Sequence, residues 1–268
     1  MVTEIDTNKI NYFRGYPIFS LSWAKYLGSK KRNITTILVL SIPILLSMLL
    51  LLNPFIYWTS FTLSYQIISL TYTFYIAFGV MIVLFFATYV TSDEISDKTI
   101  SYLLHSPISR EELGFWKLLA FLSFSIVLFW ALEAVFFFVF SFPHLNVVNG
   151  DNFTVFIGLY EITAINILLY GSFFFLVSVA TDKPIVYGLI VGFADQILAG
   201  TIFPNLAGAY SFSYHIKAIT EDILNNSQGI PFIFTPFMKV QDSYIVIFGL
   251  IIVFNLLTMF ILRRKEFN

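Results

Sequence analysis

The sequence predicts an all-α membrane protein with six transmembrane helices, and three observations lead to this fold class. Of its 268 residues, 58% are hydrophobic and 12% charged, with a mean hydropathy of +0.82, which is more apolar surface than a soluble fold of this length can bury. Apolar runs without charge recur along the chain, and each meets or approaches the ~20 residues needed to cross a ~30 Å hydrocarbon core. Basic residues flank these runs in a pattern that indicates their orientation.

Residues 1–33 are expected to form a cytoplasmic leader. Its last part, residues 17–33, mixes aromatic and aliphatic side chains with the cations Lys25, Lys30, Lys31 and Arg32. As a helix, this part would lie in the inner membrane interface as an elbow, with its aromatic rings at headgroup depth and its cations toward anionic lipid. The alternative is a disordered basic leader. The first apolar run has no small-residue cleavage site after it, so we expect it to remain as an anchor.

Residues 34–262 are expected to form one membrane domain, because no repeat or low-complexity linker interrupts them. The short turn at 181–184 predicts that the fourth and fifth spans are antiparallel. In the long external stretch 204–243, Ile216, Ile219 and Ile223 are spaced by three and then four residues, which predicts a short amphipathic helix on or in the outer leaflet. The six predicted spans are 34–52, 67–90, 118–142, 153–180, 185–203 and 244–262.

The basic residues predict that both termini are cytoplasmic. All of them except Lys217 and Lys239 fall in the leader, in the segment between the second and third spans, in the 181–184 turn or in the basic tail 263–268. Basic flanks are retained on the cytoplasmic side of a membrane. An even number of spans agrees with this orientation.

The segment 91–117 is the long polar stretch of the cytoplasmic side. Thr91-x-x-Glu94 and Ser109-x-x-Glu112 are capping-box patterns, which are typical of helix starts. Pro107 disfavours helical dihedrals at the residue before it, so the first helix is expected to stop near His105. The pattern therefore predicts a helix, a tight break and a second helix that continues into the third span.

On the first of these helices, Ile95, Thr99 and Leu103 repeat every four residues and form an apolar stripe. The stripe faces either the membrane domain or a partner protein. A short capped helix of this kind is suited to transmit force as a rigid lever. The alternative is an ordinary interfacial helix that packs on its own bundle.

Three acids interrupt the apolar runs: Glu133, Glu161 and Asp195. Each lies about 12 to 14 Å from the outer end of its predicted helix, so the three could share one layer. No Lys or Arg is expected at that depth, and burial should favour the neutral acids unless water or a bound cation intervenes. They are candidates for a polar layer that lines a translocation path. The alternative is protonated carboxyls that form hydrogen bonds between helices.

Several kinds of site are excluded or not expected. The chain has no cysteine, which excludes disulfides and thiol catalysis, and its three scattered histidines form no metal-ligand spacing. It has no G-x-x-x-x-G-K-[ST] loop, so it is not expected to hydrolyse ATP itself. No nucleic-acid partner is expected. Two N-x-[ST] triplets make Asn152 and Asn225 possible glycosylation sites in external loops.

The polar segment contains a run of motifs: Glu94, Asp97-Lys98-Thr99, Leu103-Leu104, Ser106-Pro107-Ile108-Ser109-Arg110 and Lys117. This run resembles the signature of the ABC-2-type transporter permease family, which places Glu, Gly-Thr, Leu-Leu, Pro-x-Ser-Arg and Lys after its second span. Lys98 departs from the usual glycine, which puts a close backbone approach at that point in doubt. The leader helix, six spans, long last external loop and basic tail are also similar to the family architecture.

The resemblance implies a permease subunit of an ATP-binding-cassette exporter in a prokaryotic plasma membrane. The subunit is then not an enzyme and holds no cofactor, because ATP and Mg²⁺ bind to a separate ATPase chain. A second permease copy or a related permease would complete the path, and the aromatic content favours a lipophilic or amphipathic cargo. The resemblance also implies that residues 91–117 form a coupling segment whose helix, the coupling helix, docks on the ATPase. Its contacts would be made by Glu94, Thr99, Leu103, Leu104, Pro107 and Arg110.

The alternative function is a stand-alone secondary transporter coupled to protons or cations through Glu133, Glu161 and Asp195. Such a protein would work without a partner ATPase. It would be sensitive to neutralisation of these acids and insensitive to changes at Glu94 or Arg110.

Overall fold

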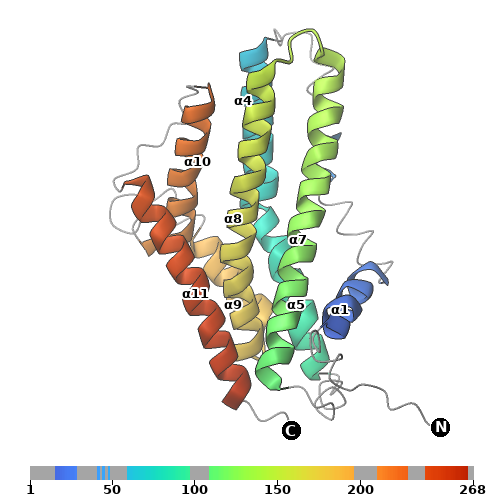
Figure 1. Ribbon diagram of the computed structural model, residues 1–268, viewed down its shortest axis with the longest axis vertical. Helices are drawn as coiled ribbons and strands as arrows, with labels where there is room; N and C mark the ends of the chain where they lie inside the picture. Colours follow the sequence, from blue (N-terminus) through green and yellow to red (C-terminus); the bar gives the residue numbers. More distant parts are fainter. Residues whose placement is uncertain are drawn as a thin grey trace, which may run out of the picture.

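The computed structural model describes residues 16–28, 59–96, 109–195, 210–228 and 239–264, together with residues 41, 42, 44, 45 and 48. Throughout these residues the regular secondary structure is helical, which confirms the all-α prediction (Figure 1). The elements are α1 (Tyr16–Gly28), α4 (Ser60–Thr71), the π-helix η2 (Tyr72–Ala77), α5 (Gly79–Ser96), α7 (Arg110–Ser141), the 3-10 helix η3 (Phe142–His144), α8 (Gly150–Ala180), α9 (Pro184–Phe193), α10 (Phe212–Gln228) and α11 (Val240–Arg264).

Four helical stretches are long and apolar enough to cross a membrane: Phe61–Tyr89, Arg110–His144, Gly150–Ala180 and Val240–Arg264. They coincide with the predicted second, third, fourth and sixth spans. Most of the predicted first span, 34–52, lies outside the described residues. The predicted fifth span, 185–203, is described only as far as Asp195. Its helix α9 has 10 residues and a length of about 15 Å, half of the bilayer core.

Helix α8 lies at the centre of the bundle and packs against α5, α7, α9, α10 and α11. Small residues permit the close approach of its neighbours, as is usual between membrane helices. A Cβ atom at Gly171 would lie 2.6 Å from Cδ2 of Leu122 on α7. Polar contacts add to this packing, since Trp130 Nε1 donates to the Tyr160 carbonyl at 3.0 Å and Tyr160 Oη donates to the Trp130 carbonyl at 2.9 Å.

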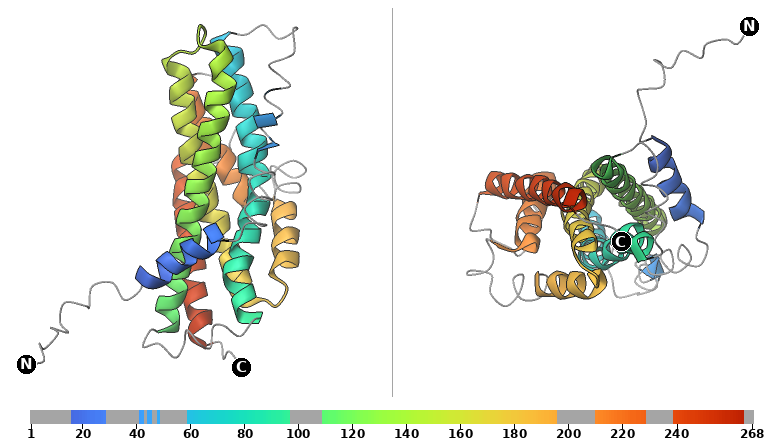
Figure 2. Two further views of the ribbon diagram at one scale, coloured as in Figure 1. Left: turned by 90° about the vertical axis from the view of Figure 1, so that its right-hand side faces the viewer. Right: turned by 90° about the horizontal axis from the view of Figure 1, so that it is seen from below.

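Helix α1 runs obliquely across the bundle near one end and packs on α7 (Figure 2). Trp23 Nε1 donates to Ser123 Oγ at 3.1 Å, and the buried Tyr26 ring stacks on Phe124 with 4.4 Å between ring centroids. A helix is therefore present at Tyr16–Gly28 of the predicted leader, and its position in the membrane interface stays a prediction. Its aromatic side chains anchor it to the third span through these contacts.

The predicted second span is not a uniform α-helix. It begins at Ser60 behind a capping box made by Thr59 and Thr62, passes through η2, and continues as α5 to Ser96. The helix start expected at Thr91 is wrong, because α5 runs through this residue without a break. Inside a continuous helix the backbone N–H groups already have partners, so a capping side chain has nothing to satisfy.

Candidate functional site

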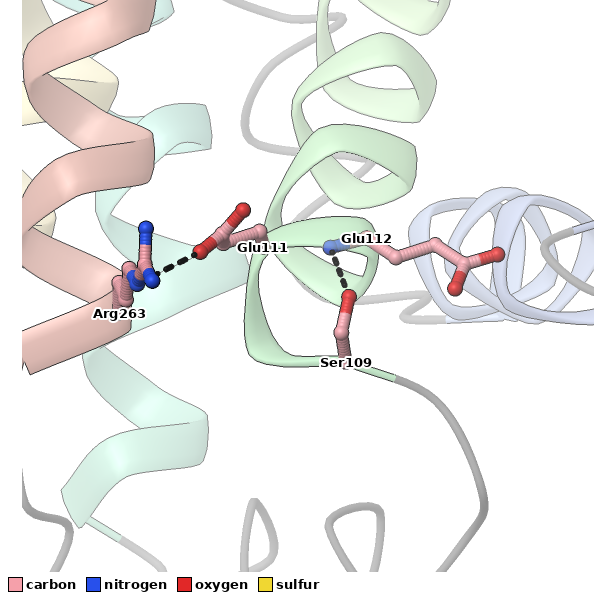
Figure 3. Close-up of polar contacts among 4 residues, drawn as sticks. All are labelled: Ser109, Glu111, Glu112 and Arg263. Carbon is pink, nitrogen blue, oxygen red and sulfur yellow. Dashed lines mark hydrogen bonds and ion pairs between the residues drawn. The ribbon is translucent and has the colours of Figure 1, made fainter.

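The start of α7 and the end of α11 lie together at one end of the bundle, which we call the charged end. Its charged residues are Arg110, Glu111 and Glu112 of α7 and Arg263 and Arg264 of α11. The Arg263 Nε atom lies 3.5 Å from Glu111 Oε1 (Figure 3). Both side chains are exposed, so this ion pair adds little stability. It does establish that the last turn of α11 lies beside the first turn of α7.

The start of α7 is fixed by a cap that the sequence predicted. Ser109 has extended backbone dihedrals, and its Oγ accepts a hydrogen bond of 3.2 Å from the Glu112 backbone N–H (Figure 3). Two acidic residues in the first turn, Glu111 and Glu112, complement the positive end of the helix dipole. Helix α7 therefore begins at Arg110, as the capping pattern at Ser109 predicted.

The predicted ATPase-contact residues are only partly placed. Glu94 lies in the last turn of α5, and Arg110 is the first residue of α7. Thr99, Leu103, Leu104 and Pro107 lie outside the described residues. The structure thus places the two ends of the predicted coupling segment, and the contacts of the segment remain a prediction.

Glu133 of α7 is buried, with 2% of its surface exposed. Its Oε1 atom accepts a hydrogen bond of 2.5 Å from Thr163 Oγ1 on α8. Helices α7 and α8 are thus joined by a carboxyl group in an apolar interior.

Asn166 lies three residues after Thr163 on α8, about one helical turn, and has a role that the sequence did not predict. Its Nδ2 donates to the Ile76 carbonyl of η2 at 3.0 Å. A π-helix has a looser backbone hydrogen-bond pattern than an α-helix and is often found at functional sites. The bond from Asn166 holds this irregular segment against α8.

Asp195 follows α9 and binds the start of α10, an arrangement we call the Asp195 clasp. Its Oδ1 accepts from the Phe212 backbone N–H at 2.8 Å and its Oδ2 from the Ser213 N–H at 2.9 Å. Tyr170 Oη of α8 also donates to Oδ2. The carboxylate therefore satisfies N–H groups at the positive end of a helix that starts inside the bundle.

Lys217 of α10 is a cation linked to the Asp195 clasp, because Lys217 and Asp195 interact electrostatically. Helix α10 belongs to the predicted external loop and packs against α8 and α11. The expectation that no Lys or Arg lies at the depth of the three acids remains a prediction.

Glu161 has a third kind of environment. It is exposed on α8 and interacts electrostatically with Tyr244 of α11. The three acids thus have separate surroundings. Glu133 is buried and bonded to α8, Glu161 lies on an exposed helix surface, and Asp195 caps α10. Their role as a translocation path remains a prediction.

The two candidate glycosylation sites lie in helices. Asn152 is fully buried in the first turn of α8, where its Nδ2 donates to Ser64 Oγ at 2.6 Å and its Oδ1 accepts from the Asn149 N–H at 2.8 Å. The nitrogen that would carry a glycan is therefore not accessible, contrary to the expectation of an external loop. Asn225 is in α10, and its side chain lies outside the described residues.

Replacing Asp195 with alanine is expected to loosen α10. Loss of a capping side chain costs about 0.5–2 kcal/mol, and the buried partner Tyr170 would lose its acceptor as well. The chain lacks cysteine, so the substitution Ala218→Cys, at a position that is 0% exposed in α10, can report opening by its thiol-labelling rate. We expect D195A to raise this rate roughly 5- to 30-fold.

The substitution Tyr210→Cys, at a position that is 89% exposed, is the matched control for this labelling experiment. Its thiol should react at the same rate with and without D195A. Equal protection of the thiol introduced by Ala218→Cys in both backgrounds would show that the clasp does not hold α10 in place.

A comparison with known protein families agrees with the resemblance found in the segment between α5 and α7. A family model described as ABC-2 family transporter protein matches residues 10–225 of the 268. This range includes α1, the predicted coupling segment and most of α10. No curated protein matches the sequence.

Proposed function

Since the chain belongs to the ABC-2 family of transporter proteins and is an ABC transporter permease subunit, we propose that it exports a lipophilic or amphipathic compound. The energy comes from a separate ATPase subunit that docks on residues 91–117. Family membership implies an ABC ATPase partner in general, and the docking site, the cargo and the direction are our proposals.

The observation that carries the proposal is the continuity of the helices at both ends of the predicted coupling segment. Helix α5 extends to Ser96, and α7 runs as 32 helical residues from its cap at Ser109. A helix of that length is about 48 Å long. A push on the segment between these helices would therefore move two membrane spans as levers.

The charged end is the cytoplasmic face in this proposal. Arg110, Lys183, Arg263 and Arg264 lie at helix termini on this side of the bundle, as the retention of basic flanks in the cytoplasm requires. An ABC ATPase binds ATP in the cytoplasm. Orientation and docking site thus support each other.

The cargo proposal is based on the surface of the spans. Aromatic residues make up 19% of the chain, and α11 exposes a row of large apolar side chains: Ile245, Phe248, Ile252, Val253, Leu256, Leu257 and Phe260. A second permease, identical or related, would enclose the path together with this chain. ATP binding would then shift the pair between states of different cargo affinity.

The proposal predicts that ATP hydrolysis depends on a second polypeptide. The tagged full-length chain, purified in mild detergent from its own cells, should bring down an ABC ATPase. After reconstitution into vesicles, hydrolysis should require that chain, and compounds that are cargo should stimulate it.

The stand-alone transporter gives the opposite result in the same vesicles. Solute movement at full rate without nucleotide and without a companion chain would overturn the proposal. The secondary-transporter reading would then account for the activity.

A further inference from the structure

Within the part of the chain that the structure describes, several buried polar side-chain atoms have no hydrogen-bond partner, and Oε2 of Glu133 and Oδ1 of Asn166 are two of them. Both side chains are 2% exposed. A buried acceptor without a donor costs about 1–3 kcal/mol, so two such atoms in one region require an explanation.

The two acceptors belong to one polar cluster at the junction of three helices. Glu133 comes from α7 and bonds to Thr163, which lies three residues before Asn166 and hence on the same face of α8. Asn166 in turn bonds to the Ile76 carbonyl of η2. We call these residues, Glu133, Thr163, Asn166 and Ile76, the Glu133 cluster.

The surroundings of the Glu133 cluster are apolar and aromatic. Tyr75, next to Ile76, makes ring contacts with the buried Phe129 and Phe136 on either side of Glu133 along α7. Among the described residues, the titratable groups that interact with Glu133 are Tyr75 of η2 and Tyr160 of α8, and neither supplies a positive charge at neutral pH. A charged carboxylate is costly in such a place.

A single proton shared between Glu133 Oε2 and Asn166 Oδ1 would give both atoms a hydrogen bond. Two acceptors cannot satisfy each other, but a protonated carboxyl is a donor as well as an acceptor. We propose that Glu133 is an intramembrane proton-binding site, with its proton on Oε2 shared with Asn166 Oδ1. The proton comes from water when the site is exposed, and it turns the Glu133 cluster into a continuous hydrogen-bonded link between α7, α8 and η2.

The proposal has a consequence for movement of the bundle. In the proposed pairing, loss of the proton would leave a carboxylate oxygen and an amide oxygen without a donor between them, so the packed arrangement of α7, α8 and η2 favours the protonated form. Proton release then requires water to reach Glu133 through separation of these helices. This inference goes beyond the proposed function and does not depend on the identity of the ATPase.

Infrared spectroscopy tests the proton directly. Full-length protein in lipid nanodiscs at pH 7 should show the C=O stretch of a protonated carboxyl, a band that shifts in deuterated water. The band should disappear in E133Q, in which an amide of the same shape replaces the acid. It should persist in E161Q, the matched control that removes the exposed acid of α8.

Substitution of the shared acceptor adds a second readout. Asn166→Leu should shift the band, because the acid proton loses its acceptor, whereas Asn255→Leu, the same change on α11, should leave it in place. Absence of the band in the wild-type protein, or its survival in E133Q, would overturn the proposal. An unchanged band in Asn166→Leu would overturn the pairing with Asn166.

Discussion

Replacing Gly79 with valine is expected to lower the free energy of unfolding of the helix bundle by about 3 kcal/mol, the upper part of the usual range for overpacked cores. A Cβ atom at this position would lie 2.5 Å from Cε1 and 3.2 Å from Cζ of Phe129. Non-bonded carbon atoms need about 3.5–4.0 Å, so the ring or the helix has to move.

The Phe129 ring has little room to move. It is fully buried on α7 and contacts the Tyr75 ring edge-on, with 6.3 Å between the centroids. Gly79 is also the first residue of α5, directly after η2 and the turn at Phe78. Valine here would separate α5 from α7 at the point where the π-helix ends.

Gly249→Val is the matched control, because a Cβ atom at Gly249 of α11 meets nothing within 4 Å. Unfolding of the purified variants by denaturing detergent, followed by circular dichroism, gives the comparison. The control should remain close to wild type. Equal midpoints for both variants would mean that α5 and α7 are not in close contact at Gly79.

The long helices could be predicted from the sequence because their signals are local. The predicted fourth span, 153–180, and sixth span, 244–262, each lie within one helix, and the structure extends them by a few polar residues to Gly150–Ala180 and Val240–Arg264. The cap at Ser109 was also predictable, since the serine and the N–H it binds are three residues apart. Length, hydropathy and short spacing determine these features.

The irregular parts of the bundle depend on contacts between residues far apart in the chain. The residues of η2, Tyr72 to Ala77, are as apolar as those of a regular span. The side chain that binds the Ile76 carbonyl belongs to Asn166, which is 90 residues away. The cap of α10 likewise comes from Asp195, 17 residues before Phe212. A hydropathy profile places Asp195 inside an apolar span. It contains no information on the helix that the carboxylate contacts, so the cap of α10 could not be predicted from it.

Replacing Arg110 with glutamate is expected to weaken binding of the ATPase subunit at least roughly tenfold, or about 1.4 kcal/mol. Arg110 is half-buried at the first position of α7, where the cap at Ser109 fixes the helix start. A guanidinium at this place presents a fork of donors to a partner carboxylate. Glutamate would replace that attraction with repulsion between like charges.

Lys183→Glu provides the matched control for Arg110→Glu. It makes the same change in sign on an exposed residue of the turn between α8 and α9, at the same end of the bundle but outside the predicted docking segment. The readouts are the amount of ATPase that co-purifies with the tagged chain and the ATP hydrolysis of the reconstituted complex. If docking depends on the segment between α5 and α7, Arg110→Glu lowers both and Lys183→Glu lowers neither. An equal loss in the two variants would instead indicate attraction between the partner and the overall charge of this face, because only a localised contact distinguishes two residues with the same charge on the same side.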